Sequence, residues 1–282
     1  MTTNPSAVPP LFTGLCDDAA IFPPGELPLP QAVPAHRTHR TAWYAGLVGP
    51  FLCGAGALGA LLELVDEPLA IGVIVPAGST GLAPALETVA TEPRLRVAGA
   101  EVAADPGMAP AEGARRVVAA FERLLPAGAC GAVEIPRGPD LPAALDVLAG
   151  TPYRAKFRTG GTAAGAFPTE PELAAFVTGC VERGLPFKCT AGLHHAVRHT
   201  DPATGFEHHG FLNVLLATHA ALTGGDPRAL LAERDGKELA SAASELTVPQ
   251  ISAVRAAFTA FGTCSVVEPL DDLIALGLIQ AR

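Results

Sequence analysis

The sequence predicts a (β/α)8 barrel, an α/β fold in which eight parallel strands alternate with helices. Short apolar runs alternate with Gly- and Pro-rich turns and with helical stretches rich in Ala and Leu, which is typical of a parallel sheet. The alternation recurs eight times within 282 residues, a length that one such barrel fills. A doubly wound open sheet is the alternative, although no G-x-G-x-x-G motif follows the first strand.

Local sequence places each element. Apolar runs that end at a turn predict strands at 11–16, 44–53, 69–76, 95–103, 131–136, 154–159, 187–192 and 264–268. Stretches rich in Ala and Leu predict helices at 31–41, 56–65, 82–90, 112–125, 141–148, 171–183, 210–222 and 270–278. Residues 224–262 are extra chain with two further helices, which we interpret as a helical insertion packed on the barrel before the last strand. The whole chain, 1–282, is then a single barrel domain.

Composition narrows the class of partner. Hydrophobic residues make up 49% of the chain and charged residues 17%, which excludes a disordered chain. The net charge of −9 disfavours nucleic acid and anionic membranes as partners, so we expect a small-molecule substrate. Residues 43–62 carry no charge, but Pro50 and five glycines indicate a strand, a turn and a helix in place of a membrane span. Assembly into a homo-oligomer is left open.

The six cysteines form no C-x-x-C pair and are scattered through apolar segments. A chain of this size does not need disulfides for stability. The pattern is typical of a reduced compartment, so we expect a cytoplasmic protein.

Lysine is rare in this chain and its placement is informative. Of the 19 basic residues only three are lysines, Lys156, Lys188 and Lys237. Arginine serves wherever charge alone is needed, whereas an amine can lose its proton near neutral pH and attack a carbonyl. The first two lysines lie on adjacent predicted strands, which indicates amine chemistry inside the barrel.

Catalytic groups of a barrel lie at the carboxyl ends of its strands. Because strand side chains alternate between faces, Lys156 and Arg158 share one face, as do Lys188 and Thr190. We expect these four to point into the barrel and Phe157 to point outward, with Cys189, toward the helices. One ammonium would repel the other and free an amine for Schiff-base chemistry. The alternative is that both lysines are ion-paired with Asp17, Glu101 and Glu134, or bind an anionic ligand.

The two lysine strands resemble those of the deoxyribose-phosphate aldolase group of class I TIM-barrel aldolases. That group carries Lys-Thr-Ser-Thr-Gly on its sixth strand and Lys-x-Ser-Gly-Gly on its seventh. The matching segments here are Lys156-Phe157-Arg158-Thr159-Gly160, Lys188-Cys189-Thr190-Ala191-Gly192 and, on the fifth strand, Val133-Glu134-Ile135. The resemblance implies a Schiff-base lysine at Lys156 and a second lysine at Lys188 that keeps it unprotonated.

The sequence also departs from that group. The proton-relay Asp of the fourth strand falls near Ala103, so Glu101, Asp105 or Asp17 would have to replace it. Arg158 replaces a small hydroxyl residue, and Leu193-His194-His195 replaces a basic phosphate loop. The substrate of the group is therefore not carried over.

Histidines form a second cluster near the end of the seventh strand. His194 and His195 follow that strand and His209 precedes the next helix, and Arg198 and Asn213 are expected around the same loop. Histidine titrates near neutrality, which suits acid/base work or carboxylate binding at the barrel mouth. A divalent metal site is the alternative, but the spacing matches no specific zinc pattern, so we assign no metal ligands and expect no cofactor.

Together these features predict a Schiff-base-forming lyase, aldolase-like or a related dehydratase or decarboxylase, that acts on a small, anionic carbonyl compound. Lys156 attacks the carbonyl, Lys188 keeps it unprotonated, Arg158 holds the substrate anion, and Glu134 or Asp17 moves protons. The remaining substrate-binding residues expected are Thr159, Thr190, His194, His195, Arg198, His209, Asn213 and Glu101. Two alternatives stand: a metal-dependent lyase or hydrolase with His and carboxylate ligands, and a non-catalytic barrel that binds an anionic metabolite.

Overall fold

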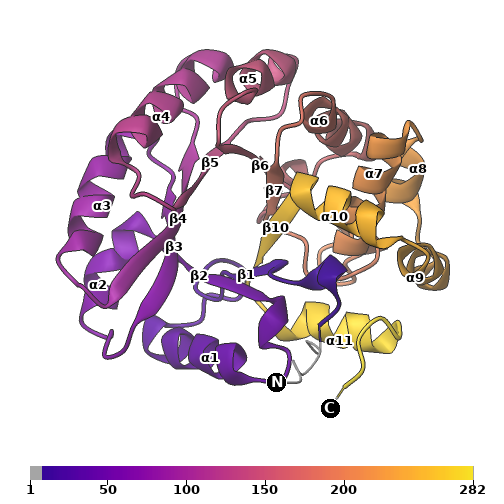
Figure 1. Cartoon of the computed structure of the whole chain (residues 1–282), viewed down its shortest axis with the longest axis horizontal. Coiled ribbons are helices and arrows are strands. Elements are labelled where there is room, and N and C mark those ends of the chain that lie inside the picture. Colours follow the sequence, from indigo (N-terminus) through magenta and orange to yellow (C-terminus); the bar gives the residue numbers. More distant parts are fainter. Residues whose placement is uncertain (1–7, 282) are drawn as a thin grey trace.

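The computed structural model describes residues 8–281 and contains a closed barrel of parallel strands with helices around it (Figure 1). The strands follow one another around the barrel in the order β1-β10-β7-β6-β5-β4-β3-β2. They are β1 (Cys16–Asp18), β2 (Val48–Gly54), β3 (Leu69–Val75), β4 (Leu95–Ala103), β5 (Cys130–Glu134), β6 (Arg154–Arg158), β7 (Phe187–Thr190) and β10 (Phe258–Thr263). The (β/α)8 barrel is therefore confirmed. The domain span of 1–282 includes residues 1–7 and 282, which lie outside the described residues.

Helices cover the outer face of the barrel, and a two-stranded antiparallel hairpin follows β7. The α-helices are α1 (Leu29–Thr41), α2 (Leu58–Leu62), α3 (Leu82–Ala90), α4 (Pro110–Leu124), α5 (Leu141–Leu148), α6 (Glu170–Glu182), α7 (Phe211–Thr223), α8 (Pro227–Ala232), α9 (Gly236–Ser244), α10 (Val248–Ala257) and α11 (Val267–Ala275). The hairpin strands are β8 (His199–Thr200) and β9 (Glu207–His208), and 3-10 turns are η1 (Pro10–Phe12), η2 (Ala45–Leu47), η3 (Ala55–Ala57), η4 (Ser79–Gly81) and η5 (Ala164–Ala166).

The last barrel strand is β10, and the prediction of a strand at 264–268 was wrong. Phe258 and Phe261 stack on Phe187 and Phe211 at centroid distances of 5.2 Å each, and this packing holds 258–263 extended. Tertiary contacts thus override the helical appearance of the segment. Glu268 consequently lies in the first turn of α11 and not at a strand end. Three helices, α8 to α10, separate α7 from β10, and their interpretation as an insertion stays a prediction with its boundary moved from 262 to 257.

The first strand also lies later than expected. Residues 11 and 12 belong to η1, which begins at two prolines, and both side chains are buried. The strand β1 instead contains Asp17 and Asp18, which were expected to follow it. Asp17 therefore faces the barrel interior, whereas Asp18 accepts a hydrogen bond from His36 of α1 at 2.9 Å on the outside.

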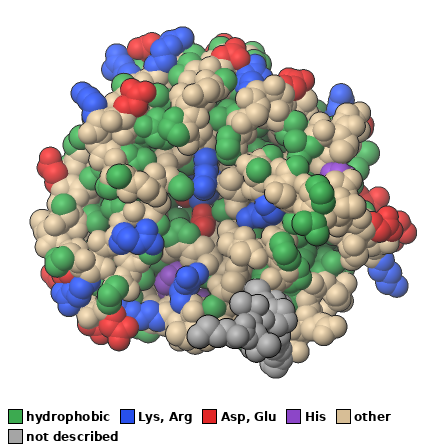
Figure 2. Space-filling view, viewed as in Figure 1, with side chains coloured by type: hydrophobic (Ala, Val, Ile, Leu, Met, Phe, Trp, Pro, Cys, Tyr) green, Lys and Arg blue, Asp and Glu red, His purple; other side chains and the backbone are tan. Residues whose placement is uncertain are grey.

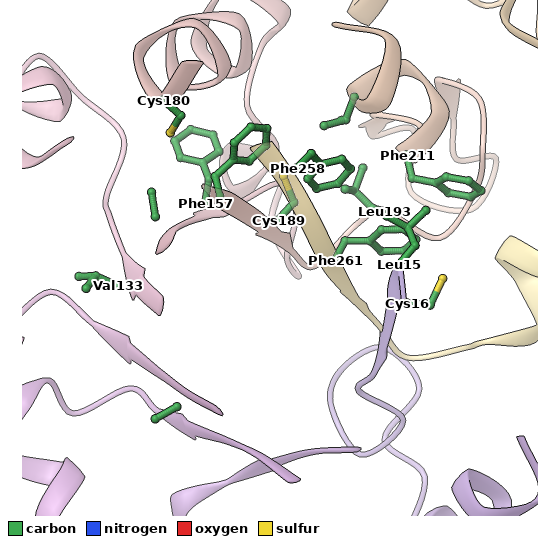
Figure 3. Packing of buried hydrophobic residues seen from close by; sticks show 14 of the residues in the cluster. Leu15, Cys16, Val133, Phe157, Cys180, Cys189, Leu193, Phe211, Phe258 and Phe261 are labelled. Atoms are coloured by element: carbon green, nitrogen blue, oxygen red, sulfur yellow. The ribbon is translucent and has the colours of Figure 1, made fainter. Parts of the chain in front are cut away.

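An aromatic layer lies between the strands and helices α6 and α7 (Figure 3). Phe157 of β6 stacks on Phe176 of α6 with ring centroids 4.4 Å apart, and Phe176 meets Phe187 of β7 edge-on. Cys189 is buried in the same layer. The outward direction expected for Phe157 and Cys189 is confirmed, and their neighbours along the strands are thereby turned into the barrel.

Small residues on several strands leave room inside the barrel. A Cβ at Gly72 would lie 2.6 Å from Cδ2 of Leu52, and one at Gly262 would lie 3.3 Å from Cδ1 of the same side chain. Leu52 thus fills part of the interior, and charged side chains occupy the rest. Seen down the barrel axis, basic and acidic side chains lie next to each other at the centre of the molecule (Figure 2).

No helix within residues 8–281 combines the length and the apolar character that a membrane span requires. The uncharged segment 43–62 forms η2, β2, η3 and α2. Its prolines and glycines break it into the strand, turn and helix that the sequence indicates.

Gly49 of β2 is required by the side chain beside it. A Cβ at this position would lie 2.1 Å from Oδ1 of Asp17, and Asp17 cannot turn away because Lys188 holds its other oxygen. We expect Gly49→Ala to lower the free energy of unfolding by about 1–3 kcal/mol, as overpacking of a buried site does. Urea unfolding followed by circular dichroism measures this.

The matched control is Gly59→Ala in α2, where a Cβ would meet no described atom within 4 Å. Alanine is the better helix former, so this variant should be as stable as the parent chain or more stable. Equal stability of the two variants would contradict the steric argument.

Candidate active site

Charged side chains project into the barrel from five strands. Glu134, Lys156 and Lys188 are register partners on β5, β6 and β7, and partners at one level of a sheet point to the same face. Because Phe157 packs outward, Lys156 lies inside. Lys188 also lies inside, since it contacts Asp17 across the interior. The structure thus brings the two lysines and their expected carboxylates together.

These side chains form one continuous series of ion pairs with alternating sign. Nζ of Lys188 lies 2.5 Å from Oδ2 of Asp17 and also donates a hydrogen bond to Oε1 of Glu101. Oε2 of Glu101 lies 2.6 Å from Nζ of Lys156, and that Nζ lies 3.0 Å from Oε2 of Glu134. Arg158 ends the series, with Nε 3.0 Å from Oε1 of Glu134. We call this set the interior ion-pair network: Asp17, Lys188, Glu101, Lys156, Glu134 and Arg158.

The network is balanced, with three carboxylates and three cations, and its centre is buried. Lys156 and Lys188 are 2% and 3% exposed and Glu101 is 6% exposed. An unpaired buried charge is strongly destabilising, so each member depends on its neighbours. The ion pairing that the sequence left as the alternative to a free amine pair is formed in this state.

Glu101 is ionised near neutral pH because two lysines surround it. Burial alone would raise the pKa of this carboxyl, but the ammonium groups of Lys156 and Lys188 lower it to about 2. Burial alone would likewise lower the pKa of Lys188, yet Asp17 and Glu101 outweigh it and raise that pKa above the ordinary value. Lys188 is therefore a fixed cation near neutral pH. The pKa of Asp17 is raised, chiefly by burial, so Asp17 holds a proton more readily than its neighbours do.

Lys156 is held differently from Lys188. Lys188 donates aligned hydrogen bonds to two carboxylates. Lys156 lies 2.6 Å from Oε2 of Glu101 and 3.0 Å from Oε2 of Glu134, and its contact with Glu101 is less well aligned than the hydrogen bonds of Lys188.

A cavity of about 440 Å³ opens at the carboxyl ends of β4, β5 and β6. Glu134 and Arg158 line it, together with Asp105 and Arg137. The Arg158 side chain, which lines the cavity, is half exposed and donates a hydrogen bond from Nε to Glu134. Lys156 does not line this cavity, but it contacts Glu134, which does. A larger groove, of about 920 Å³, lies elsewhere, along the outer faces of α5 and α6.

The two predicted threonines lie at the ends of β6 and β7 and have different roles. Thr159 is buried, and its hydroxyl donates to the carbonyl oxygens of Thr190 and Ala191 at the end of β7. Thr190 is the register partner of Arg158 and lies near Gly262 of β10. Thr159 therefore joins β6 to β7, and Thr190 alone of the two lies on the inner wall.

His194 and His195 contact α11 and not the interior network. Nδ1 of His194 lies 3.0 Å from Glu268, and Nδ1 of His195 lies 3.1 Å from Asp272. These carboxylates counteract the burial of the rings. They raise the pKa of His195 above its ordinary value, and Glu268 acts with Cys264 to raise that of His194 to about 9.

Arg198, His209 and Asn213 lock the loop after β7. Arg198 pairs with Glu170 at 2.8 Å and donates to Nδ1 of His209, whose Nε2 donates to the carbonyl of Pro168 at 2.8 Å. Asn213 accepts from the amide of Arg198 and donates to backbone carbonyls at 230 and 233 in α8 and the turn after it. All three side chains bind groups of the protein itself, which indicates a structural role.

Sequence reasoning missed three polar clusters. Asp105 accepts from the amide and hydroxyl of Ser79 and so joins the loops after β3 and β4 beside the cavity. Asp18 pairs with His36, and Cys264 contacts His194. The spacing of residues in the sequence does not predict such contacts, because each contact joins segments that are far apart in the chain. In residues 8–281 no three His, Cys, Asp or Glu side chains are grouped so that they could hold a metal ion.

Comparisons with known proteins leave the family open. No protein-family model matches the chain, and no curated protein matches it. A solved structure, a proposed fructose-1,6-biphosphate aldolase from Coccidioides immitis, is similar over 90% of this chain and 94% of its own, with 9% sequence identity and a TM-score of 0.42. This likeness is too weak to assign a fold or an activity.

Glu101 links both lysines, so its removal should unbalance the network. We expect Glu101→Gln to lower the free energy of unfolding by about 3–5 kcal/mol at neutral pH, because two buried ammonium groups lose a counter-charge. The folded pKa of about 2 lies below the ordinary 4.5, so Glu101 contributes stability above about 4.5 that is lost as pH falls toward 2. Urea titrations at several pH values should show this acid loss in the parent chain and a smaller one in the variant. Glu122→Gln, at an exposed position of α4, is the control, and an equal effect of both substitutions would contradict the argument.

His209 should make the loop after β7 sensitive to acid. Burial is the main cause that lowers the pKa of its imidazole, from 6.5 to about 4, so the unfolded chain takes up this proton first. The contribution of His209 to the free energy of unfolding is therefore fully present above about pH 6.5. It is lost as the pH drops toward 4, by about 3 kcal/mol in all. Unfolding of His209→Gln should show a flatter pH dependence in this window, whereas His219→Gln in α7 should follow the parent chain. Identical pH profiles of the parent chain and His209→Gln would contradict this role.

Proposed function

We propose that the chain is a lyase that forms a Schiff base between Lys156 and a small anionic carbonyl compound, and then breaks a carbon–carbon bond. The observation that supports this most directly is a buried amine held between two carboxylates, one contact below a cavity with an arginine on its wall. An amine nucleophile, a proton acceptor and an anion-binding group are the parts that such chemistry requires.

Arg158 selects the class of substrate. Its guanidinium is half exposed at the cavity, and planar donors of this kind bind carboxylate or phosphate through two parallel hydrogen bonds. A volume of about 440 Å³ suits a small metabolite. The substrate is therefore a short carbonyl compound with one anionic group.

Substrate binding prepares the amine through charge balance. Glu134 neutralises both Lys156 and Arg158 in the free protein, and these cations lower its pKa against the effect of burial. A substrate anion on Arg158 replaces Glu134 as the partner of the guanidinium. Glu134 then accepts a proton from Lys156 more readily, and the amine becomes neutral while the total charge of the site stays compensated.

The reaction then proceeds with protons moving between Lys156 and Glu134. The nitrogen lone pair attacks the carbonyl carbon, and the resulting carbinolamine loses its hydroxyl as water with the proton that Glu134 returns. The iminium withdraws electrons, so the bond between the α and β carbons breaks and its electron pair forms an enamine. Glu134 takes the proton of the β-hydroxyl, whose oxygen forms a double bond to the β carbon, and the fragment that contains this carbon leaves as an aldehyde. Protonation of the enamine and addition of water restore the amine.

Lys188 stays protonated and keeps its neighbouring carboxylates in place. Its raised pKa keeps it charged, and it holds Glu101 in the ionised state through an aligned hydrogen bond. Asp17 in turn holds Lys188. This cation stabilises the electron-rich enamine side of the reaction and does not itself attack the substrate.

Borohydride trapping tests the proposal. Reduction in the presence of pyruvate or glycolaldehyde should fix one adduct on Lys156, located by peptide mass spectrometry, because only a neutral amine forms the imine that is reduced. Lys156→Arg should abolish the adduct, since guanidinium forms no Schiff base. Lys188→Arg should keep the fold and shift the pH at which the adduct forms.

The exposed Lys237 of α9 is the internal control for nonspecific labelling. Arg158→Gln should raise the carbonyl concentration needed for trapping by pyruvate about tenfold and leave trapping by the uncharged glycolaldehyde nearly unchanged, as the loss of one charge-assisted contact predicts. An adduct on Lys237 alone, or no adduct across a panel of small carbonyl compounds, would overturn the Schiff-base assignment.

A further inference from the structure

A second cluster of reactive side chains lies outside the interior network. Cys264 directly follows β10, His194 lies in the loop after the neighbouring strand β7, and Glu268 lies in the first turn of α11. Sγ of Cys264 is 3.7 Å from Nδ1 and 3.8 Å from Nε2 of His194. Nδ1 of the same ring lies 3.0 Å from Oε2 of Glu268. None of the three lines the 440 Å³ cavity.

We propose that Cys264, His194 and Glu268 form a nucleophilic thiol site that adds reversibly to small aldehydes. A thiol beside an imidazole that a carboxylate orients is the arrangement that activates cysteine for attack on carbon. This site is independent of the Schiff-base chemistry assigned to Lys156.

The imidazole of His194 carries positive charge beside the sulfur of Cys264. Burial would lower the pKa of the His194 imidazole, but Cys264 and Glu268 raise it to about 9, so the ring is cationic near neutral pH. A cationic ring beside sulfur stabilises the thiolate, which is the form that reacts. The other titratable groups that act on this pair are His195 and Asp272, on the α11 side, and His208 of β9.

The cluster is partly covered and partly exposed. Cys264 is partly buried, and a Cβ at Gly25 in the loop after β1 would lie 2.9 Å from Cβ of Cys264, so this loop covers one side of the thiol. The side chain of His194 is 13% exposed and that of Glu268 is 46% exposed, so solvent reaches both partners of the thiol. A small aldehyde is therefore the size of partner that we expect.

The chemical step needs no further reactant. The thiolate sulfur attacks the aldehyde carbon and a carbon–sulfur bond forms, while the π electrons of the carbonyl move to oxygen. That oxygen takes a proton from the His194 imidazolium, which gives a hemithioacetal and a neutral imidazole. Expulsion of the thiolate reverses each movement. Disulfide formation has no described partner here, because the cysteines at 16, 53, 180 and 189 are buried and Cys130 lies at the amino end of β5.

Alkylation by iodoacetamide tests the thiolate. An ordinary thiol is about 1% ionised at about pH 6.5, so Cys264 should react there at least about tenfold faster than Cys130 despite lower exposure. Cys130 is the matched control, since it is exposed and has Arg154 at 3.4 Å but no imidazole contact among the described residues. Peptide mass spectrometry measures both rates in one sample. Equal rates at both cysteines would overturn the proposal.

Variants assign the roles. His194→Gln should slow alkylation of Cys264 about tenfold at about pH 6.5 and leave Cys130 unchanged. Glu268 is a positioning residue. Glu268→Gln should therefore shift the pH dependence of the alkylation rate of Cys264, while Cys264 stays reactive. Thermal unfolding of each variant checks that it is folded. If His194→Gln does not fold, the comparison of Cys264 with Cys130 in the parent chain decides alone.

Protection by glycolaldehyde tests the ligand class. The aldehyde should slow alkylation of Cys264 in the parent chain, should protect Cys130 far less, and should lose its effect on Cys264 in His194→Gln. Removal of the aldehyde by dialysis should restore the original rate, because the hemithioacetal is reversible. Absence of protection, or equal protection of both cysteines, would overturn the aldehyde site. These readouts involve sulfur only, so they are separate from the fate of the lysine adduct.

Discussion

The carboxylate of Glu101, between the ammonium groups of Lys156 and Lys188, is the contact on which the interior of this barrel depends. Each oxygen of the carboxylate faces one lysine, and the lysines reach Glu134 and Asp17 on their other sides. No member of this series can be buried alone, because an unpaired charge in the barrel would be strongly destabilising. The identity of side chains on five strands is thus fixed by one alternating pattern of charge.

The hydrophobic layer outside the barrel makes this pattern possible. Stacking of Phe157 on Phe176 and of Phe261 on Phe211 holds β6 against α6 and β10 against α7. Phe187 stacks on Phe258 between β7 and β10. Because side chains alternate, each outward aromatic turns its neighbour inward. Charged residues make up only 17% of the chain, yet six of them form one network in the interior and at the mouth of the barrel. Apolar packing outside and ion pairing inside therefore fix the same strand register.

Periodicity predicts which face a side chain occupies, and it does not predict the partner of that side chain. The alternation of apolar runs and helices, and the inward direction of Lys156, follow from the sequence. The last strand does not, because Phe258 and Phe261 are held extended by rings that are distant in the chain. His209 and Asn213 were expected at the barrel mouth for a similar reason: their sequence position near a strand end is correct, but contacts with Pro168 and with the region of α8 use up their hydrogen-bonding groups.

Because the network has as many cations as carboxylates, a proton can move within it without changing its total charge. In a site with surplus positive charge, repulsion alone could free an amine, and the site would lose a charge when the proton left. Here the proton of Lys156 has an acceptor 3.0 Å away in Glu134, and the carboxylate that this proton neutralises is the one that a substrate anion on Arg158 can replace. The transfer leaves the sum of buried charges unchanged, which is the condition under which a proton can move in a medium of low dielectric without a large penalty. The ion pairs that protect the fold in the free protein are thus the same pairs that make the amine more available when an anionic ligand binds at Arg158.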